Sequence, residues 1–234
     1  AATAAEIDTQ VTSIKTTYTA NEAKGVTYTL ATTADDITGG SKNDTFSGVV
    51  DADTAANDTF SALDSLDGGA GTDLLKVTFA SDAGNTNTFP AATISNIETF
   101  SIKNQDDNDA VTVNFANISG ETTVKSELST SDVTFTNLAS GTNVDLIGNG
   151  SLSNGAFSYG YAAAANTSTL DIMDGVTAGA VTETGTGLLT SNINSTGAAN
   201  TIGALGIAAS VTALNINATT NLTTGAITSA AVTT

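Results

Sequence analysis

The sequence predicts an all-β fold dominated by a parallel β-solenoid, with a short helix before it. Short segments alternate apolar and polar residues, which is the period of a half-buried strand. Gly, Asn or Ser separates these segments and suits tight corners and stacked polar ladders. Aromatic residues make up only 5% of the chain, whereas β-sandwiches usually carry several large core rings. One antiparallel β-sandwich, or a pair of them, remains the alternative that the strand spacing allows.

The helix is expected in residues 1–24. Ile7, Val11, Ile14 and Tyr18 recur there at the spacing of one helical face. A repeat array exposes apolar side chains at its open end. This zone is therefore expected to be an N-terminal helical cap or a linker. The first residues lack the basic start of a signal peptide, so we expect an internal fragment or a signal elsewhere.

Two further zones follow. Residues 25–90 are rich in Asp and Gly, and residues 91–234 are rich in Thr, Ala, Asn and Gly. The later zone contains the clearest strand patterns and is expected to form the parallel solenoid. These patterns fall at residues 97–102, 111–115, 133–135, 144–147, 169–172, 188–193 and 211–216.

Charge restricts the partners of this chain. It has 234 residues and a formal net charge of −18, and nothing after Glu183 has an ionisable side chain. Such a chain repels nucleic acid and anionic membrane surfaces. It also has no run of 18 apolar residues, so we expect no membrane insertion. Ten aspartates lie between Asp35 and Asp82, against only Lys42 and Lys76. Dense carboxylates favour hard cations, above all calcium.

Residue types that most enzymes need are missing. There is no histidine, cysteine or arginine, so Ser-His-Asp triads, thiolate chemistry and ordinary zinc sites are excluded. Extracellular polysaccharide lyases on β-helices need Lys, Arg, His or Tyr beside carboxylates. Lysine stops here at Lys125, and the one tyrosine pair, Tyr159 and Tyr161, is expected to pack in a loop. We therefore expect no enzyme.

One motif carries specific chemistry. Residues 68–76 read GGAGTDLLK and match the calcium-binding β-helix nonapeptide G-G-x-G-x-D-x-U-x at every fixed position. The glycines permit backbone conformations that turn carbonyls toward a cation. Asp73 supplies a hard oxygen, and Leu75 is expected to anchor the next strand in the core.

Degenerate copies precede this motif. Residues 39–47 keep both glycines and the aspartate but place Lys42 where glycine is expected, and residues 34–37 and 57–60 keep only the tail. A calcium-binding, β-roll-like module is therefore expected over residues 25–90. Its expected ligands are Asp36, Asp44, Asp58, Asp64, Asp67, Gly69, Gly71 and Asp73.

Two alternatives stay open for these acidic residues. The aspartates of the motif copies can instead bond the backbone as ordinary Asp/Gly turns between strands. A separate acidic run at residues 106–109 is interpreted as a solvated loop, with an extra cation site as its alternative.

Three blocks together carry a resemblance to a known family. They are TADDITG with NDTF (residues 33–39 and 43–46), LDGGAGTDLL (66–75) and ISNIETF (94–100). In order and spacing they resemble a module of the RTX-type surface-layer proteins of Gram-negative bacteria, over roughly residues 25–102. The resemblance implies type I secretion, calcium-dependent folding, a β-solenoid and lattice assembly on the cell surface.

The expected function is thus a structural surface-layer or coat segment, extracellular and at the surface of a bacterium. Its expected partners are further copies of itself, in a lattice or filament, and a cell-surface polysaccharide. The alternative is an adhesin or carbohydrate-binding module of a type I secreted protein.

Overall fold

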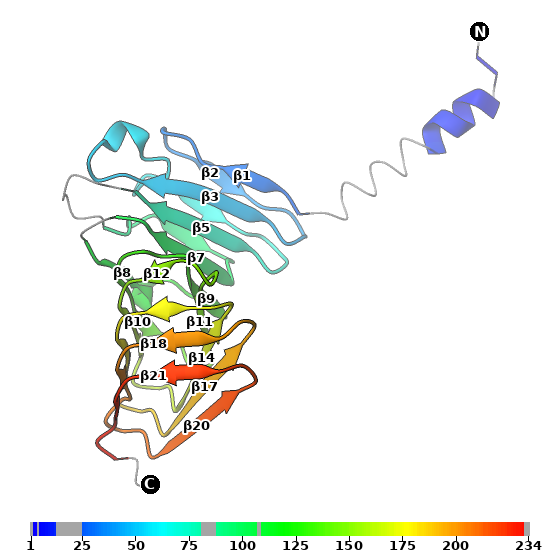
Figure 1. The fold of residues 1–234 in the computed structure, drawn as a ribbon. Helices are drawn as coiled ribbons and strands as arrows, with labels where there is room; N and C mark the ends of the chain where they lie inside the picture. Colours follow the sequence, from blue (N-terminus) through cyan, green and yellow to red (C-terminus); the bar gives the residue numbers. More distant parts are fainter. Residues whose placement is uncertain (1, 4, 13–24, 81–87, 107–108, 232–234) are drawn as a thin grey trace.

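The protein is a parallel β-solenoid with one short N-terminal helix (Figure 1). The computed structural model describes residues 2–3, 5–12, 25–80, 88–106 and 109–231. Within them every paired strand runs parallel to its partner. The predicted fold class is confirmed, and the antiparallel sandwich is excluded.

A nine-stranded sheet forms one continuous wall of the solenoid. Its strands, in spatial and sequence order, are β1 (Thr27–Thr29), β3 (Thr45–Val50), β5 (Leu74–Phe79), β7 (Thr99–Asn104), β9 (Thr123–Glu127), β11 (Asn143–Ile147), β14 (Thr167–Met173), β17 (Thr190–Thr196) and β20 (Ala213–Ala218).

Three smaller sheets complete the turns. A three-stranded sheet contains β2 (Asp36–Thr38), β4 (Ser65–Asp67) and β6 (Thr93–Ser95). A six-stranded sheet contains β8 (Val111–Asn114), β10 (Val133–Leu138), β13 (Phe157–Tyr161), β16 (Val181–Thr184), β19 (Leu205–Gly206) and β22 (Ile227–Thr228). A four-stranded sheet contains β12 (Ser153–Asn154), β15 (Thr177–Ala178), β18 (Asn200–Ile202) and β21 (Leu222–Thr224). Two short 3₁₀ turns lie at Ala55–Asn57 and Phe115–Asn117.

The cross-section changes along the rod. The three-stranded sheet ends at β6, and the six-stranded sheet begins at β8. The nine-stranded sheet passes through this region without a break, because Leu74 of β5 pairs with Thr99 of β7. Residues 25–90 and 91–234 therefore contribute strands to one shared wall while differing in the sheets opposite it.

Aromatic rings run along the interior. Phe135 is fully buried, and its ring centroid lies 6.0 Å from that of Phe115 and 5.6 Å from that of Phe157. Tyr159 and Tyr161 extend the series as inward-facing, buried residues of β13. The prediction that these two tyrosines pack in a loop was wrong: they alternate with small residues on a strand, so both rings face the core.

Buried polar side chains satisfy the backbone at the corners. Asn200 is the fullest case. Its side-chain oxygen accepts hydrogen bonds from the backbone N–H groups of Gly175 and Val176, and its nitrogen donates to the carbonyl oxygens of Ile172 and Thr196. Hydrogen bonds from buried side chains therefore stabilise the turns of the second half, in addition to apolar packing.

A buried carboxylate lies in the same half. Glu183 of β16 points inward and accepts hydrogen bonds from the hydroxyl groups of Ser168, Ser191 and Tyr159, and from the backbone N–H of Ala208. Four donors thus surround the carboxylate, which is the condition under which a buried charge is tolerated. The cluster is buried and its hydrogen bonds are made within the protein, so it is a structural element of the core.

The helix covers residues 5–12. Thr3 and Glu6 form a reciprocal capping box: the Thr3 backbone N–H donates to Glu6 Oε2, and the Glu6 N–H donates to Thr3 Oγ1. All eight helical residues are exposed. Two further members of the predicted apolar stripe, Ile14 and Tyr18, lie outside the described residues.

Candidate metal-binding corner

Three acidic residues stack at one corner of the first turns. Asp44, Asp73 and Glu98 each stand immediately before a strand of the nine-stranded sheet: β3, β5 and β7, respectively. The sheet register aligns these strand starts, because Thr45 pairs with Leu74 and Leu74 with Thr99. We call these three residues the acidic column.

Each carboxylate of the acidic column bonds the turn before it. The backbone N–H of Val26 donates to Asp44 Oδ1 at 2.6 Å, and that of Asp44 donates to Asp73 Oδ1 at 2.6 Å. The Asp73 N–H in turn donates to Glu98 Oε2 at 2.8 Å. These bonds are the turn chemistry left open by the sequence, and they account for one oxygen of each carboxylate.

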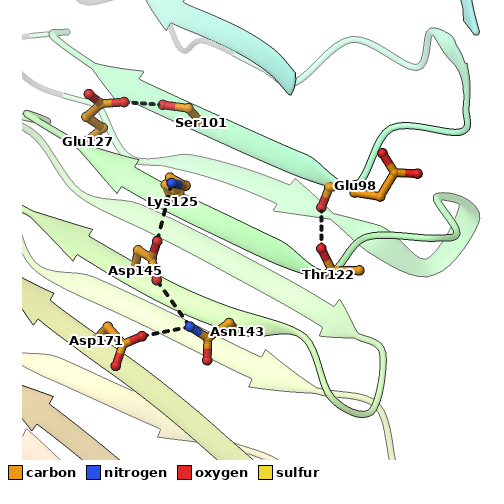
Figure 2. A network of polar contacts seen from close by, with 8 residues as sticks. All are labelled: Glu98, Ser101, Thr122, Lys125, Glu127, Asn143, Asp145 and Asp171. Atoms are coloured by element: carbon orange, nitrogen blue, oxygen red, sulfur yellow. Dashed lines mark hydrogen bonds and ion pairs between the residues drawn. The ribbon is translucent and has the colours of Figure 1, made fainter. Parts of the chain in front are cut away.

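Neutral residues stand at the equivalent positions after Glu98, namely Thr122, Thr142, Asn166, Leu189 and Thr212. The hydroxyl group of Thr122 donates to the Glu98 backbone oxygen at 3.3 Å, as Figure 2 shows. Thr212 repeats the pattern near the other end, where its hydroxyl donates to the Leu189 carbonyl at 3.3 Å. The corner therefore changes along the rod from acidic to neutral residues, which matches the fading charge of the sequence.

The second oxygens of Asp44 and Asp73 have different surroundings. Asp44 Oδ2 accepts the Gly40 N–H at 2.6 Å. Asp73 is fully buried, and its Oδ2 atom has no hydrogen-bond partner. The equivalent donor, the N–H of Gly69, is directed to Asp67 Oδ1 at 3.0 Å instead. The complete nonapeptide thus leaves one buried carboxylate oxygen without a donor.

Glycine makes room for further oxygens at this corner. A Cβ atom on Gly68 would overlap the Asn96 carbonyl oxygen and lie 2.6 Å from Asp73 Oδ2. The same geometry occurs one turn earlier, where a Cβ on Gly39 would overlap the Gly68 carbonyl oxygen and lie 2.7 Å from Asp44 Oδ2. At each corner the missing side chain lets a carbonyl of the next turn approach the carboxylate, and these are the ligand types that calcium prefers.

The two predicted ligand glycines have unusual backbones. Gly69 has φ +85° and Gly71 has φ +140°, and both contact the backbone of the preceding turn. These conformations are rarely open to residues with a Cβ. They explain why the motif needs glycine at both positions.

Burial raises the pKa of the Asp73 carboxyl group. A hydrogen bond from the Asp44 backbone lowers it, and the nearby charges of Glu98, Asp44 and Asp67 raise it further. The ionised form of Asp73 is thus disfavoured by desolvation and by like charge. A cation at this corner would relieve both effects.

This shift predicts an unusual pH dependence in the presence of EDTA. A carboxyl group whose pKa is raised on folding binds its proton more tightly in the folded state, so its contribution to stability falls as the pH rises through the window between the unfolded value, about 3.9, and the raised folded value. The free energy of unfolding of the wild type minus that of Asp73→Asn should therefore decrease between pH 4 and pH 7. Urea unfolding of both proteins at several pH values measures it. A difference that stays constant with pH would contradict the electrostatic account of Asp73.

The structure separates the other predicted ligands. Asp67 is close enough to Asp73 to influence its charge and accepts a hydrogen bond from Asn96 Nδ2 at 2.7 Å. Asp64 lies at a different corner, where both its oxygens accept backbone N–H groups, from Asp35 and Ser61.

The two remaining predicted ligands lie elsewhere. Asp58 bonds the Asp51 N–H in a loop, and Asp36 is an exposed residue of β2. Among the described residues no three acidic side chains form a metal-sized cluster. A ligand set at Asp73 therefore has to include backbone carbonyls and water.

The acidic run at residues 106–109 differs from the solvated loop predicted for it. Asp106 is fully buried. The Asp109 carbonyl accepts a hydrogen bond from the buried Asn104 side chain at 2.8 Å. Residues 107 and 108 lie outside the described part of the chain.

A second polar network lies on the nine-stranded sheet (Figure 2). Lys125 forms an ion pair with Asp145 at 3.5 Å, and Asn143 donates to Asp171 at 2.7 Å. Burial raises the pKa of Asp145, whereas the charge of Lys125 lowers it. Every group drawn there has a protein partner, so this network supports the register of the strands and does not point to a ligand.

Sequence reasoning missed one member of the acidic column. Glu98 was not among the predicted ligands, although a signal was available. Asp44, Asp73 and Glu98 each precede by two positions a buried large apolar residue, in the segments DTF, DLL and ETF. The same pattern also occurs at Asp58 and Phe60, so an acid at that position suggests the corner but does not by itself identify it.

Comparison with family models, with curated proteins and with solved structures gives no significant match. The described helical residues include no segment long and apolar enough to cross a membrane.

Proposed function

We propose that this chain is a structural, non-catalytic segment of an extracellular bacterial coat, and that calcium at the acidic column stabilises it. The observation that carries the proposal is Asp73 Oδ2, a fully buried carboxylate oxygen without a hydrogen-bond partner. Buried polar atoms in native proteins almost always have a partner, so each exception needs an explanation, and at Asp73 the nearby carbonyl oxygens and carboxylates favour a bound cation.

The residues present fit calcium. Calcium takes six to eight oxygen ligands from carboxylates, carbonyls and water. Asp73 would hold the ion with the Asn96 carbonyl, and Asp67, Asp44 and Glu98 supply negative charge nearby. The bound ion would supply positive charge beside Asp73, whose pKa is raised by the other three carboxylates.

The size of this effect supports a structural role. Extracellular calcium modules bind with dissociation constants of about 10⁻⁴ to 10⁻³ M. A hundredfold excess of calcium over the dissociation constant stabilises the folded state by about 2.7 kcal/mol. Typical domains are stable by only about 5–15 kcal/mol, so one such site contributes a large share.

Two features support a coat over a catalyst. The chain lacks histidine, cysteine and arginine. The buried Glu183 cluster and the network around Asp145 are satisfied within the protein.

The test is a calcium titration followed by thermal melting. Wild-type protein should melt about 5–10 °C higher in 10 mM calcium than in EDTA. Asp73→Asn removes the charge while keeping the shape, and it should lose most of that increase.

Asp132→Asn is the matched control. Asp132 also stands before a strand and accepts a backbone N–H from the next turn, that of Ala156 at 2.7 Å, but it lies outside the acidic column. It should keep the calcium-dependent increase. Equal increases in wild type and Asp73→Asn would show that the corner is ordinary turn chemistry.

A further inference from the structure

We infer that a groove beside β6 and β8 binds a short stretch of a neutral carbohydrate. The groove has a volume of about 370 Å³, and its walls come from residues 88–94, from β8 and from the 3₁₀ turn that follows β8. That volume lies at the low end of ligand pockets, about 300–1,000 Å³. The inference goes beyond the proposed coat function, because it concerns another surface and another ligand.

The groove forms where the cross-section of the solenoid changes. Ile94 lies in β6, the last strand of the three-stranded sheet, and pairs with Leu66 of β4. Ile118 stands as far before β9 as Ile94 stands before β7, so it occupies the equivalent place one turn later. No strand forms at Ile118, because residues 115–117 make a 3₁₀ turn and the Ile118 N–H donates to the Phe115 oxygen at 3.0 Å. The sheet therefore stops at β6 and leaves a space beside it.

The apolar side of the groove is held in place by the core. Phe89, Ile94 and Ile118 line the groove and are only partly buried against the core. The Phe89 ring lies edge-on to that of Phe60, with centroids 5.3 Å apart, and its centroid lies 6.4 Å from that of Phe79. These contacts fix the Phe89 ring before a ligand arrives. An aromatic ring has a negative face, which attracts the weakly positive C–H groups on one face of a sugar ring.

The polar side of the groove has free hydrogen-bonding capacity. Thr112, Asn114 and Asn117 line it and are exposed. Asn114 Oδ1 accepts hydrogen bonds from the Ala116 N–H and from Asn137 Nδ2, both at 2.9 Å, which fixes the amide and leaves Asn114 Nδ2 to donate. Within the described chain, the side chains of Thr112 and Asn117 make no hydrogen bond. A fixed amide donor beside a hydroxyl and a second amide suits sugar hydroxyl groups, which both donate and accept.

Charge selects a neutral ligand. None of the described residues that line the groove is ionisable, although the chain has a formal net charge of −18. The field of such a chain repels an anionic sugar, and a cation would find no carboxylate in the groove. A peptide strand added to the edge of β6 is disfavoured, because β6 has only 3 residues and offers few ladder hydrogen bonds.

The experiment is a titration of the isotope-labelled full chain, in calcium, followed by amide chemical shifts. The probes are neutral trisaccharides of glucose, mannose, galactose and N-acetylglucosamine. At least one should bind with a dissociation constant of about 1–10 mM, and the shifted amides should include those of Ile94, Asn117 and Ile118. Trigalacturonic acid, which is anionic, and a hexapeptide of Gly, Ser and Thr should bind about tenfold more weakly or not at all.

Two substitutions test the two sides of the groove. Thr112→Val keeps the shape and removes a hydroxyl group, so it should weaken binding by about two- to tenfold, the effect of one neutral hydrogen bond. Phe89→Leu keeps an apolar side chain and removes the ring face, so it should weaken binding by about threefold or more. The matched control is Thr134→Val. Thr134 pairs with Thr112 from the neighbouring strand β10 but does not line the groove, so this variant should bind like wild type.

The amide spectrum also shows whether each variant is folded. The proposal is overturned if no neutral trisaccharide shifts the amides of the groove at about 20 mM, or if Thr112→Val and Phe89→Leu both bind as tightly as wild type. It is equally overturned if the anionic sugar or the hexapeptide binds as tightly as the neutral sugars. These results leave the calcium-dependent rise in melting temperature untouched, so the groove and the acidic column are tested separately.

Discussion

Gly68→Ala should cause a large loss of stability for the addition of a single methyl group. The new Cβ would overlap the Asn96 carbonyl oxygen of the next turn and press on Asp73 Oδ2. Gly68 also donates its N–H to the Ser95 oxygen at 3.0 Å, so the two turns cannot separate without breaking that bond. We expect the free energy of unfolding to fall by about 4 kcal/mol or more, measured by urea unfolding in calcium.

Gly206→Ala is the control for this prediction. Gly206 lies in β19, and a Cβ there would meet nothing closer than 3.7 Å, which is ordinary van der Waals contact. Its replacement should change stability by less than about 1 kcal/mol. If the two alanine variants were equally stable, the close stacking of turns at the acidic column would be wrong.

Asn200→Ala should be the most damaging polar substitution. It removes hydrogen bonds to two buried backbone N–H groups, those of Gly175 and Val176 at 3.0 and 2.8 Å, and to three oxygen acceptors. Leaving a buried donor or acceptor unsatisfied costs about 1–3 kcal/mol for each group. Since small rearrangements recover part of this loss, we expect a decrease of about 3–5 kcal/mol in the free energy of unfolding.

Asn154→Ala provides the comparison for Asn200. Asn154 is also buried, but its nitrogen makes one hydrogen bond, to the Ser129 oxygen at 3.0 Å, and its side-chain oxygen makes none. The expected loss is about 1 kcal/mol. If Asn154→Ala lowered the free energy of unfolding more than Asn200→Ala, the number of backbone groups that each side chain bonds would not determine the loss.

The alternating sequence predicted the long wall of the solenoid well. Segments such as residues 133–135 and 169–172 fall within β10 and β14. They were visible because one face of each strand is buried and apolar while the other is polar. Periodicity of two could not show which strands pair, since pairing depends on turn length.

The sequence also contains a Gly-Ala repeat whose spacing follows the length of the solenoid turns. A Gly-Ala pair follows each strand of the four-stranded sheet, with the glycines at 155, 179, 203 and 225. Gly203 and Gly225 stack so closely that a Cβ on either would lie within about 3 Å of the backbone of the preceding turn. Because glycine and alanine also fill loops elsewhere in this chain, the repeat emerges only when the turns are aligned.

Interior polar residues were hard to predict for a different reason. Glu183 shares a strand face with Val181, and strict alternation would have directed it inward. Carboxylates are rarely buried, so composition argues for the outside. The donors that make burial tolerable, Ser168, Ser191 and Tyr159, come from three other strands and are invisible in the local sequence.

The sequence identified the central residues of the candidate corner but not its full membership. The complete nonapeptide located Asp73, and its two glycines have the unusual backbones expected of them. Asp58 was included because residues 57–60 keep the tail of the motif, and Asp64 because it leads into the complete copy, but the fold directs both to other corners. Glu98 belongs to the column because a turn of 25 residues places it beside Asp73, which spacing within the motif could not show.

A crystal structure of the full chain grown in millimolar calcium would test the central claim most directly. We predict a cation bound by Asp73 Oδ2 and by backbone carbonyl oxygens at the corner of Gly68, within a parallel solenoid. Calcium-sized density should be absent from the same corner in crystals of Asp73→Asn. A wild-type structure in calcium in which Asp73 Oδ2 instead accepts a hydrogen bond from the protein or from a water molecule would contradict the claim.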